Sequence, residues 1–179
     1  GNRRSDTQPC LTEPEVFKIA LKKVKMLLRK NPGADFISIS QNDVPERCHC
    51  KNCKALEEKY ACSGAPVFWF ADKIARAKKD EFPKVAVEIL PYVYSDEPPK
   101  GLVFSENIAI RFTTMNFCRE HQLTDEKCKY NLKQKANLDG FAKLTNNLYI
   151  WDYAANFYNY LTPIPQLYSL YWNFHYYME

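Results

Sequence analysis

The sequence predicts an α/β fold with a mainly parallel sheet, built from TIM-barrel-like β/α repeats. Four short runs of β-branched and apolar residues occur at residues 36–40, 85–90, 108–110 and 148–150. Segments with helical periodicity separate most of these runs, which is typical of a parallel sheet flanked by helices. Each run ends in polar and aromatic residues, as expected where the carboxyl ends of parallel strands form a ligand site.

The first helix is predicted to begin after Thr12, because Glu15 three residues later completes a capping box and Pro14 suits the first turn. Apolar side chains then follow at helical spacing: Val16, Ile19, Ala20, Val24, Leu27 and Leu28. Residues 31–33, Asn-Pro-Gly, stop this helix, and the strand at 36–40 follows directly.

The later elements continue the alternation with one interruption. A loop is expected over residues 44–54, and helices over about 65–80 and 129–143, with a last helix from Gln166. The proline-rich stretch 96–101 between the second and third strands has no helical period. We therefore expect one β/α unit to lack its helix.

Composition limits the kind of protein. A chain of 179 residues with 46% hydrophobic residues can bury one core, so residues 1–179 are predicted to form a single domain. A net charge of +4 is too mild to indicate nucleic-acid binding. No apolar stretch is long enough to span a bilayer, and residue 1 does not begin a signal peptide.

Four β/α units amount to half of an eight-stranded barrel and would leave open sheet edges. The first and last residues also resemble cuts within a longer chain. We therefore expect a partial barrel that is either a fragment of a larger domain or completed by a second copy.

The whole sequence resembles one family, the bacterial domain of unknown function 4838 (DUF4838). Residues 1–4, 10–16, 38–43, 48–53, 149–157 and 160–165 contain the motifs that carry the resemblance. This family is similar to glycoside hydrolase barrels and occurs in large secreted or periplasmic proteins. The resemblance implies a TIM-like barrel, a role in glycan metabolism, an exported location and further domains of the same chain as partners.

Two carboxylates are candidates for catalysis. Glycosidases generally use a pair of carboxyl groups, about 5–10 Å apart. Asp43 and Asp152 each follow a predicted strand and are expected at the same edge of the sheet, whereas Glu88 and Glu46 are weaker candidates. The alternative is structural: Asp43 would cap a loop, and Asp152 would pair with Arg111 inside the barrel. Candidates for binding an oligo- or polysaccharide are Asn42, Tyr92, Tyr94, Arg111, Trp151 and Asn156.

The cysteines form the sharpest local pattern. Cys48, Cys50 and Cys53 suit a tetrahedral soft metal such as zinc, with His49, Cys62, His121 or another cysteine as fourth ligand. A second group comprises Cys118, His121 and Cys128, and the two groups could close one zinc site or two. Disulfides are the competing interpretation for an exported protein, with Cys62 as the unpaired thiol.

Three functions fit these features. The leading one is a carbohydrate-active domain that hydrolyses a glycosidic bond. The alternative is a carbohydrate-binding or scaffolding barrel without a catalytic pair. A hydrolase that uses the cysteine and histidine cluster as its metal centre is the weakest, because catalytic zinc prefers histidine and carboxylate ligands and the chain has three histidines.

Overall fold

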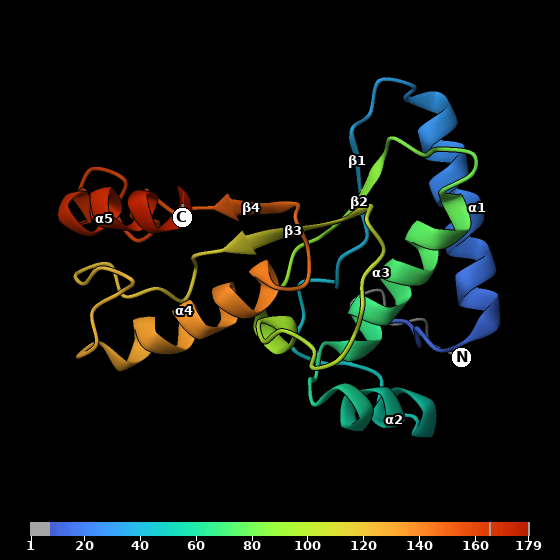
Figure 1. Ribbon diagram of the computed structural model, residues 1–179, viewed down its shortest axis with the longest axis horizontal. Helices are drawn as coiled ribbons and strands as arrows, with labels where there is room; N and C mark the ends of the chain where they lie inside the picture. Colours follow the sequence, from blue (N-terminus) through green and yellow to red (C-terminus); the bar gives the residue numbers. More distant parts are fainter. Residues whose placement is uncertain (1–7, 165, 179) are drawn as a thin grey trace.

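A computed structural model describes residues 8–164 and 166–178 and contains one parallel sheet (Figure 1). Its strands lie in chain order: β1 (Phe36–Ser38), β2 (Ala86–Ile89), β3 (Ile108–Thr113) and β4 (Leu148–Trp151). Each strand pairs in parallel with the next. The predicted α/β fold is therefore confirmed, and the arrangement is compatible with part of a barrel.

The helices lie on one face of the sheet and at its two ends. They are α1 (Pro14–Lys30), α2 (Lys51–Tyr60), α3 (Ala65–Lys78), α4 (Lys129–Ala142) and α5 (Leu167–Met178). The α1 helix packs on α3, and α3 packs on β2 and β3, while α4 and α5 lie at the β4 end (Figure 1). Between β2 and β3 the only helical segment is the single turn η1 (Val93–Ser95), as the proline-rich stretch predicted.

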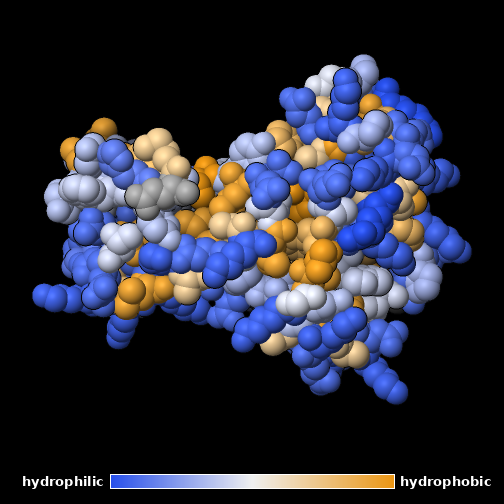
Figure 2. Space-filling view, viewed as in Figure 1, coloured by the Kyte–Doolittle hydropathy of each residue, from blue (hydrophilic) through white to orange (hydrophobic). Residues whose placement is uncertain are grey.

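The core lies between the helices and one face of the sheet. Val87, Ile110 and Phe112 point toward the helices, and each is at most 2% exposed. The ring of Phe141 on α4 lies 5.9 Å from that of Phe112 and 5.6 Å from that of Phe68 on α3. In Figure 2, hydrophobic residues gather in the middle of the molecule with hydrophilic residues around them.

The opposite face of the sheet is curved. Phe36 on β1 and Tyr149 on β4 meet at 5.3 Å between ring centroids, although two strands lie between them. Flat neighbouring strands would hold β1 and β4 about 14 Å apart, so these side chains meet because the sheet curls toward this face. The change in strand direction from β1 to β4 is visible in Figure 1.

Three local predictions were wrong. The N-cap of α1 is Glu13, and Thr12 instead contacts cysteine sulfurs. The loop expected to reach residue 54 ends early, because the Cys50 sulfur accepts the Cys53 N–H and caps α2 at Lys51. The first strand was predicted to reach residue 40 but ends at Ser38. Just beyond its end, the Ser40 hydroxyl accepts the Leu90 N–H.

The family-like motif at residues 1–4 and Pro165 of the motif at 160–165 lie outside the described residues. Within the part of the chain that the structure describes, the helices are too short or too polar to cross a membrane.

Candidate functional site

Side chains from three strand ends meet beside Tyr92, which follows β2. Its hydroxyl lies near the carboxylate of Asp43, which follows β1. Burial raises the pKa of Tyr92, and the nearby Asp43 and Tyr153 raise it further. Because Tyr153 follows β4, residues after β1, β2 and β4 lie close enough here to act on the same hydroxyl.

Buried contacts fix the backbone under this cluster. The Ser95 hydroxyl, fully buried, donates to Gln41 Oε1 at 2.6 Å and accepts the Tyr92 N–H at 3.1 Å. A Cβ on Gly64 would lie 2.5 Å from that of Ser95, so only glycine allows this approach. Val93, next to Tyr92, has a positive φ of 55°, a strained conformation for a β-branched residue. Such strain is common at functional sites.

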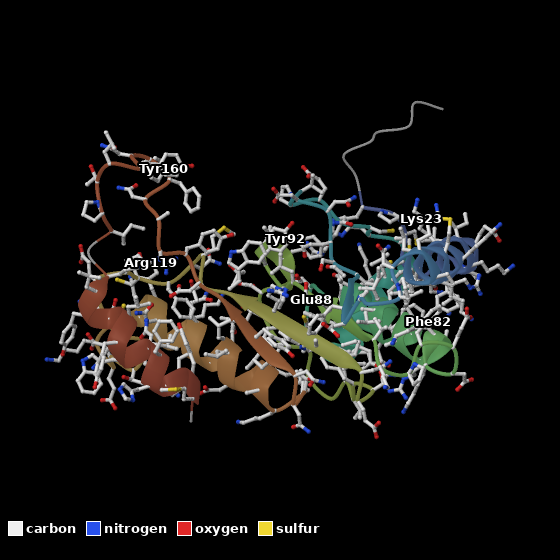
Figure 3. All side chains as sticks on the ribbon, turned by 90° about the horizontal axis from the view of Figure 1, so that it is seen from above. Lys23, Phe82, Glu88, Tyr92, Arg119 and Tyr160 are labelled. Atoms are coloured by element: carbon white, nitrogen blue, oxygen red, sulfur yellow. The ribbon has the colours of Figure 1, made fainter. Side chains whose placement is uncertain are left out.

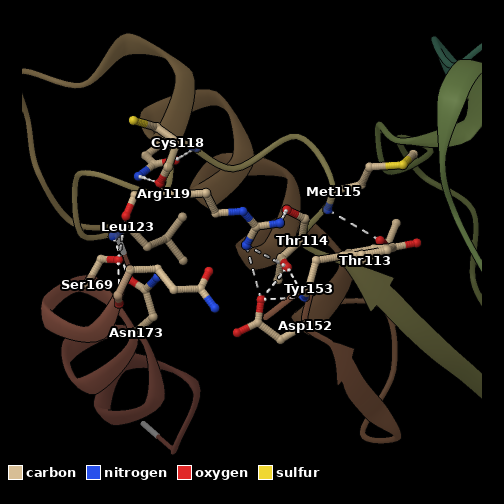
Figure 4. Close-up of polar contacts among 12 residues, drawn as sticks. Thr113, Thr114, Met115, Cys118, Arg119, Leu123, Asp152, Tyr153, Ser169 and Asn173 are labelled. Atoms are coloured by element: carbon tan, nitrogen blue, oxygen red, sulfur yellow. Dashed lines mark hydrogen bonds and ion pairs between the residues drawn. The ribbon is translucent and has the colours of Figure 1, made fainter. Parts of the chain in front are cut away.

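Asp152 is held at the end of β4 by three donors to one of its oxygens (Figure 4). Oδ1 accepts from the Thr114 hydroxyl, from the Tyr153 N–H at 2.8 Å and from Arg119 Nη1 at 3.2 Å. Arg119 also donates to the Thr114 carbonyl oxygen at 2.8 Å. No described residue donates to Oδ2. One carboxylate oxygen is therefore fixed and the other is available.

The alternative that Asp152 pairs with Arg111 was wrong. Arg111 Nε donates to Glu88 at 2.7 Å, on the curved face of the sheet. The hydrogen bonds from Arg111 end on Glu88 Oε2, and they raise the pKa of Arg111. The charge of Glu88, a weaker catalytic candidate, is therefore paired with that of Arg111 on the neighbouring strand. The expected separation of the Asp43 and Asp152 carboxyls stays a prediction.

The other predicted binding residues lie in different surroundings. Trp151 is 47% exposed, with the Arg111 guanidinium 5.9 Å from its ring. Tyr94, within η1, lies against Arg47 and near Cys48 and Cys53. Asn42 is exposed and its carbonyl accepts from Gln8, whereas Asn156 accepts two N–H groups of its own turn.

A row of aromatic rings continues from the end of β4. Trp151 stacks on Tyr153 at 6.4 Å, Tyr153 contacts Phe157 at 5.7 Å, and Phe157 contacts Tyr160 at 5.9 Å. Phe157 is 59% exposed and Tyr160 is 76% exposed. Figure 3 places Tyr160 at the tip of its loop and Glu88 and Tyr92 near the middle of the molecule.

Four cysteines form a compact group: Cys10, Cys48, Cys50 and Cys53, whose sulfurs all lie within 4.8 Å of one another. Cys10 Sγ lies 3.6 Å from Cys50 Sγ and 4.0 Å from Cys53 Sγ. The Cys53 N–H and the Thr12 hydroxyl lower the pKa of Cys50 to about 6, whereas burial raises that of Cys53 to about 12. The predicted cysteine cluster is confirmed, and it could hold a metal ion.

The fourth member of this group is Cys10, which satisfies the prediction of another cysteine as the fourth partner. His49, Cys62 and His121 are outside it. Cys62 is buried and donates to the Glu97 carbonyl oxygen at 3.1 Å. None of the seven cysteines, including these four, is joined by a disulfide in this structure.

The second predicted group is separate from the first. Cys118, His121 and Cys128 have ligand atoms within 4.8 Å of one another. Cys118 Sγ lies 3.2 Å from His121 Nδ1. The two groups therefore form two possible metal centres. Among the described residues they do not combine into the single shared site that was the other predicted arrangement.

The family model for a domain of unknown function, DUF4838, matches residues 1–179. The chain belongs to this family. No curated protein and no solved structure matches the chain.

Sequence reasoning missed several residues of this DUF4838 domain. Arg119 and Thr114, which hold Asp152, carry no local motif, because their role depends on two loops meeting. Tyr153, Phe157 and Tyr160 were detectable as aromatic residues repeated directly after the predicted strand end. Cys10 lies 38 residues before Cys48 in the sequence, so spacing alone did not connect them.

Proposed function

We propose that this DUF4838 domain is a carbohydrate-active domain of the glycoside hydrolase type. The observation that carries the proposal is the aromatic row from Trp151 to Tyr160, exposed except for the half-buried Tyr153, which begins beside Asp152. At Tyr153 the row passes near Tyr92 and Asp43. The C–H faces of sugar rings pack on aromatic rings, and the carboxylates lie at the strand ends where ligands bind α/β sheets. The row would bind an oligo- or polysaccharide.

The two carboxylates differ in a way that suits two roles. Asp152 is oriented through Oδ1, so Oδ2 could act as the base or nucleophile. Asp43 is exposed and lies near the Tyr92 hydroxyl; in its protonated form it would give the proton that the leaving glycosidic oxygen takes. In hydrolysis the C–O bond breaks as that oxygen takes the proton, and a water molecule supplies the new C–O bond and loses a proton to a carboxylate.

The test compares Asp43→Asn and Asp152→Asn with the control Asp80→Asn, an exposed aspartate just after α3. Release of reducing ends from a panel of glycans should fall by about 10²-fold or more in the first two variants. Glycan binding and thermal stability should be retained. Binding without hydrolysis by the wild type would favour the alternative, a carbohydrate-binding or scaffolding domain. Absence of any glycan binding would contradict both functions.

We also propose that the four-cysteine group binds a structural zinc ion. Tetrahedral Zn–S bonds of about 2.3 Å place the sulfurs about 3.8 Å apart. The separations of 3.6 and 4.0 Å from Cys10 fit that value. Four thiolates fill the coordination shell, so the ion would join the segment before α1 to the start of α2 and take no part in catalysis.

The zinc proposal is tested with Cys10→Ser and the control Cys62→Ser. Elemental analysis should find about one zinc ion fewer per chain in the first variant, with a lower melting temperature, and no change in the second. A free-thiol count in denaturant separates zinc from disulfides. Disulfides among these cysteines would contradict the proposal, as would seven free thiols without any bound metal.

The family resemblance supports two further parts of the proposal. The domain would act in the periplasm or outside the cell, and other domains of a longer chain would be its partners. Fractionation of the native protein with its complete gene tests both.

A further inference from the structure

We propose that Cys118, His121 and Cys128 form a second metal site, which binds a soft divalent ion such as zinc through three protein ligands. The same ion would fix the loop that carries Arg119 against Asp152. This site is distinct from the four-cysteine group and follows β3, whereas the four cysteines flank α1 and α2.

The donor geometry fits such an ion. Zinc bound by thiolate and imidazole places sulfur and nitrogen about 3.6 Å apart and two sulfurs about 3.8 Å apart. Cys118 Sγ and His121 Nδ1 are 3.2 Å apart, and all three ligand atoms lie within 4.8 Å. The described residues supply no fourth ligand to this group. Three protein ligands leave one coordination position for water or a solute, unlike the closed four-cysteine group.

A buried asparagine holds the backbone of the ligands in this geometry. Asn131 on α4 is fully buried, and its Oδ1 accepts the Cys118 N–H at 2.8 Å. Its Nδ2 donates to the carbonyl oxygens of Cys118, His121 and Gln122 at 3.2, 2.8 and 3.2 Å. Cys128 is the N-cap of the same helix. Helix α4 thus positions all three ligands.

The loop also links this group to the proposed glycan site. Arg119, between Cys118 and His121, donates to Asp152 Oδ1 and to Thr114 (Figure 4). The Arg119 carbonyl accepts from Ser169 on α5 at 2.8 Å, and the Leu123 N–H donates to Asn173 at 2.7 Å. The ligands of the ion lie on both sides of Arg119 in the sequence, so a bound ion would restrict this loop. It would thereby keep the Arg119 guanidinium against Asp152. Arg119 is therefore a positioning residue.

Metal counting on the complete chain tests the site. Protein is stripped with a chelator under reducing conditions, refilled with Zn²⁺ and analysed for bound metal. His121→Ala should bind about one ion fewer per chain than the wild type, whether or not the four-cysteine group is filled. His49→Ala is the matched control, because His49 is also exposed and belongs to neither group. Its metal content should equal that of the wild type.

Cobalt and hydrogen exchange provide the second readout. Co²⁺ bound at this site should give an absorption spectrum that disappears in His121→Ala and in Cys128→Ser, while the signal of the four-cysteine group persists. Metal addition should slow amide exchange over residues 114–123 in the wild type and not in His121→Ala. Equal metal content in wild type and His121→Ala would overturn the site, and so would a Cys118–Cys128 disulfide in the native protein. Unchanged exchange would overturn the link to Arg119.

Discussion

The two faces of the sheet are made by the same four strands and differ in nearly every other respect. Toward the helices, β3 places Ile108, Ile110 and Phe112, all at most 2% exposed. On the curved face the same strand places Arg111, which pairs with Glu88 beside the exposed Trp151. The first face packs against α3 and α4, and the second has polar groups and aromatic rings available to a ligand.

This difference separates what folds the chain from what the chain can bind. Burial of apolar area on the helix-covered face is the main source of stability. A partly buried ion pair adds little net stability, because desolvation offsets much of the attraction. Mutations on opposite faces of one strand should therefore have different consequences, and the predictions below test that contrast.

The largest effect is expected for Phe112→Ala. Phe112 is 2% exposed and contacts Phe117 and Phe141 at 6.1 and 5.9 Å. Its truncation should lower the free energy of unfolding by about 3–5 kcal/mol. The control is Thr113→Val, the next residue of β3, which should cost less than about 1 kcal/mol. Urea unfolding measures both, and equal losses would remove the contrast between the two faces.

A pH-dependent effect is expected at Lys78, buried at the end of α3, where its ammonium donates to the carbonyl oxygens of Phe82 and Val85. Burial lowers the pKa of Lys78 from 10.5 to about 8. Between pH 8 and 10.5 the unfolded chain therefore binds a proton that the folded chain has released, so this residue's contribution to stability rises with pH. The change is at most about 3.5 kcal/mol, at about 1.4 kcal/mol per pKa unit.

The Lys78 effect is isolated by comparison with Lys78→Met. The difference in free energy of unfolding, wild type minus variant, should become more positive from pH 8 to pH 10.5. The comparison removes the opposite contribution of buried thiols such as Cys62, whose pKa is raised to about 11. A difference that stays constant over this range would contradict a lowered pKa.

The helix-covered face was also the part that the sequence predicted best. Apolar runs and helical periodicity located the four strands and the helices at 65–80 and 129–143, because burial on that face requires a repeating pattern. The missed helix α2 is short, with only ten residues and three large apolar or sulfur side chains at helical spacing: Cys53, Leu56 and Tyr60. It depends on a sulfur cap from Cys50 and buries only Cys53.

The site was predicted less completely, since its contacts join distant parts of the chain. Asp43 and Tyr92 follow strands and were expected at the same edge, where Asp43 is near enough to raise the pKa of Tyr92. The predicted partner of Asp152, Arg111, was wrong, because Arg119 reaches Asp152 from a loop with no strand periodicity. Cys10 was not predicted as a named member of the cysteine group for the same reason, because a contact that depends on the fold leaves no trace in local spacing.

A smaller effect is expected on the curved face for Glu88→Gln. Its carboxylate accepts both hydrogen bonds from Arg111, whose side chain is 33% exposed. Loss of the pair should cost about 1–2 kcal/mol, because solvent can partly hydrate the remaining guanidinium. The double variant Glu88→Gln/Arg111→Met should recover part of this loss, with a coupling of about 1 kcal/mol in the cycle. Additive losses would indicate that the pair makes no joint contribution.

The smallest effect on stability is expected for Trp151→Ala, which also tests function. Trp151 is 47% exposed, so its removal should change the free energy of unfolding by less than about 1 kcal/mol. If its ring supports a sugar, glycan affinity should fall about tenfold, the equivalent of one aromatic contact of about 1.4 kcal/mol. The matched control is Trp172→Ala on α5, a tryptophan 44% exposed and remote in sequence from the aromatic row. Calorimetric titration with the best-bound glycan should separate the two variants. Equal losses of affinity would show that exposed aromatic residues bind the glycan without regard to the strand ends, and the site would then have to be sought elsewhere.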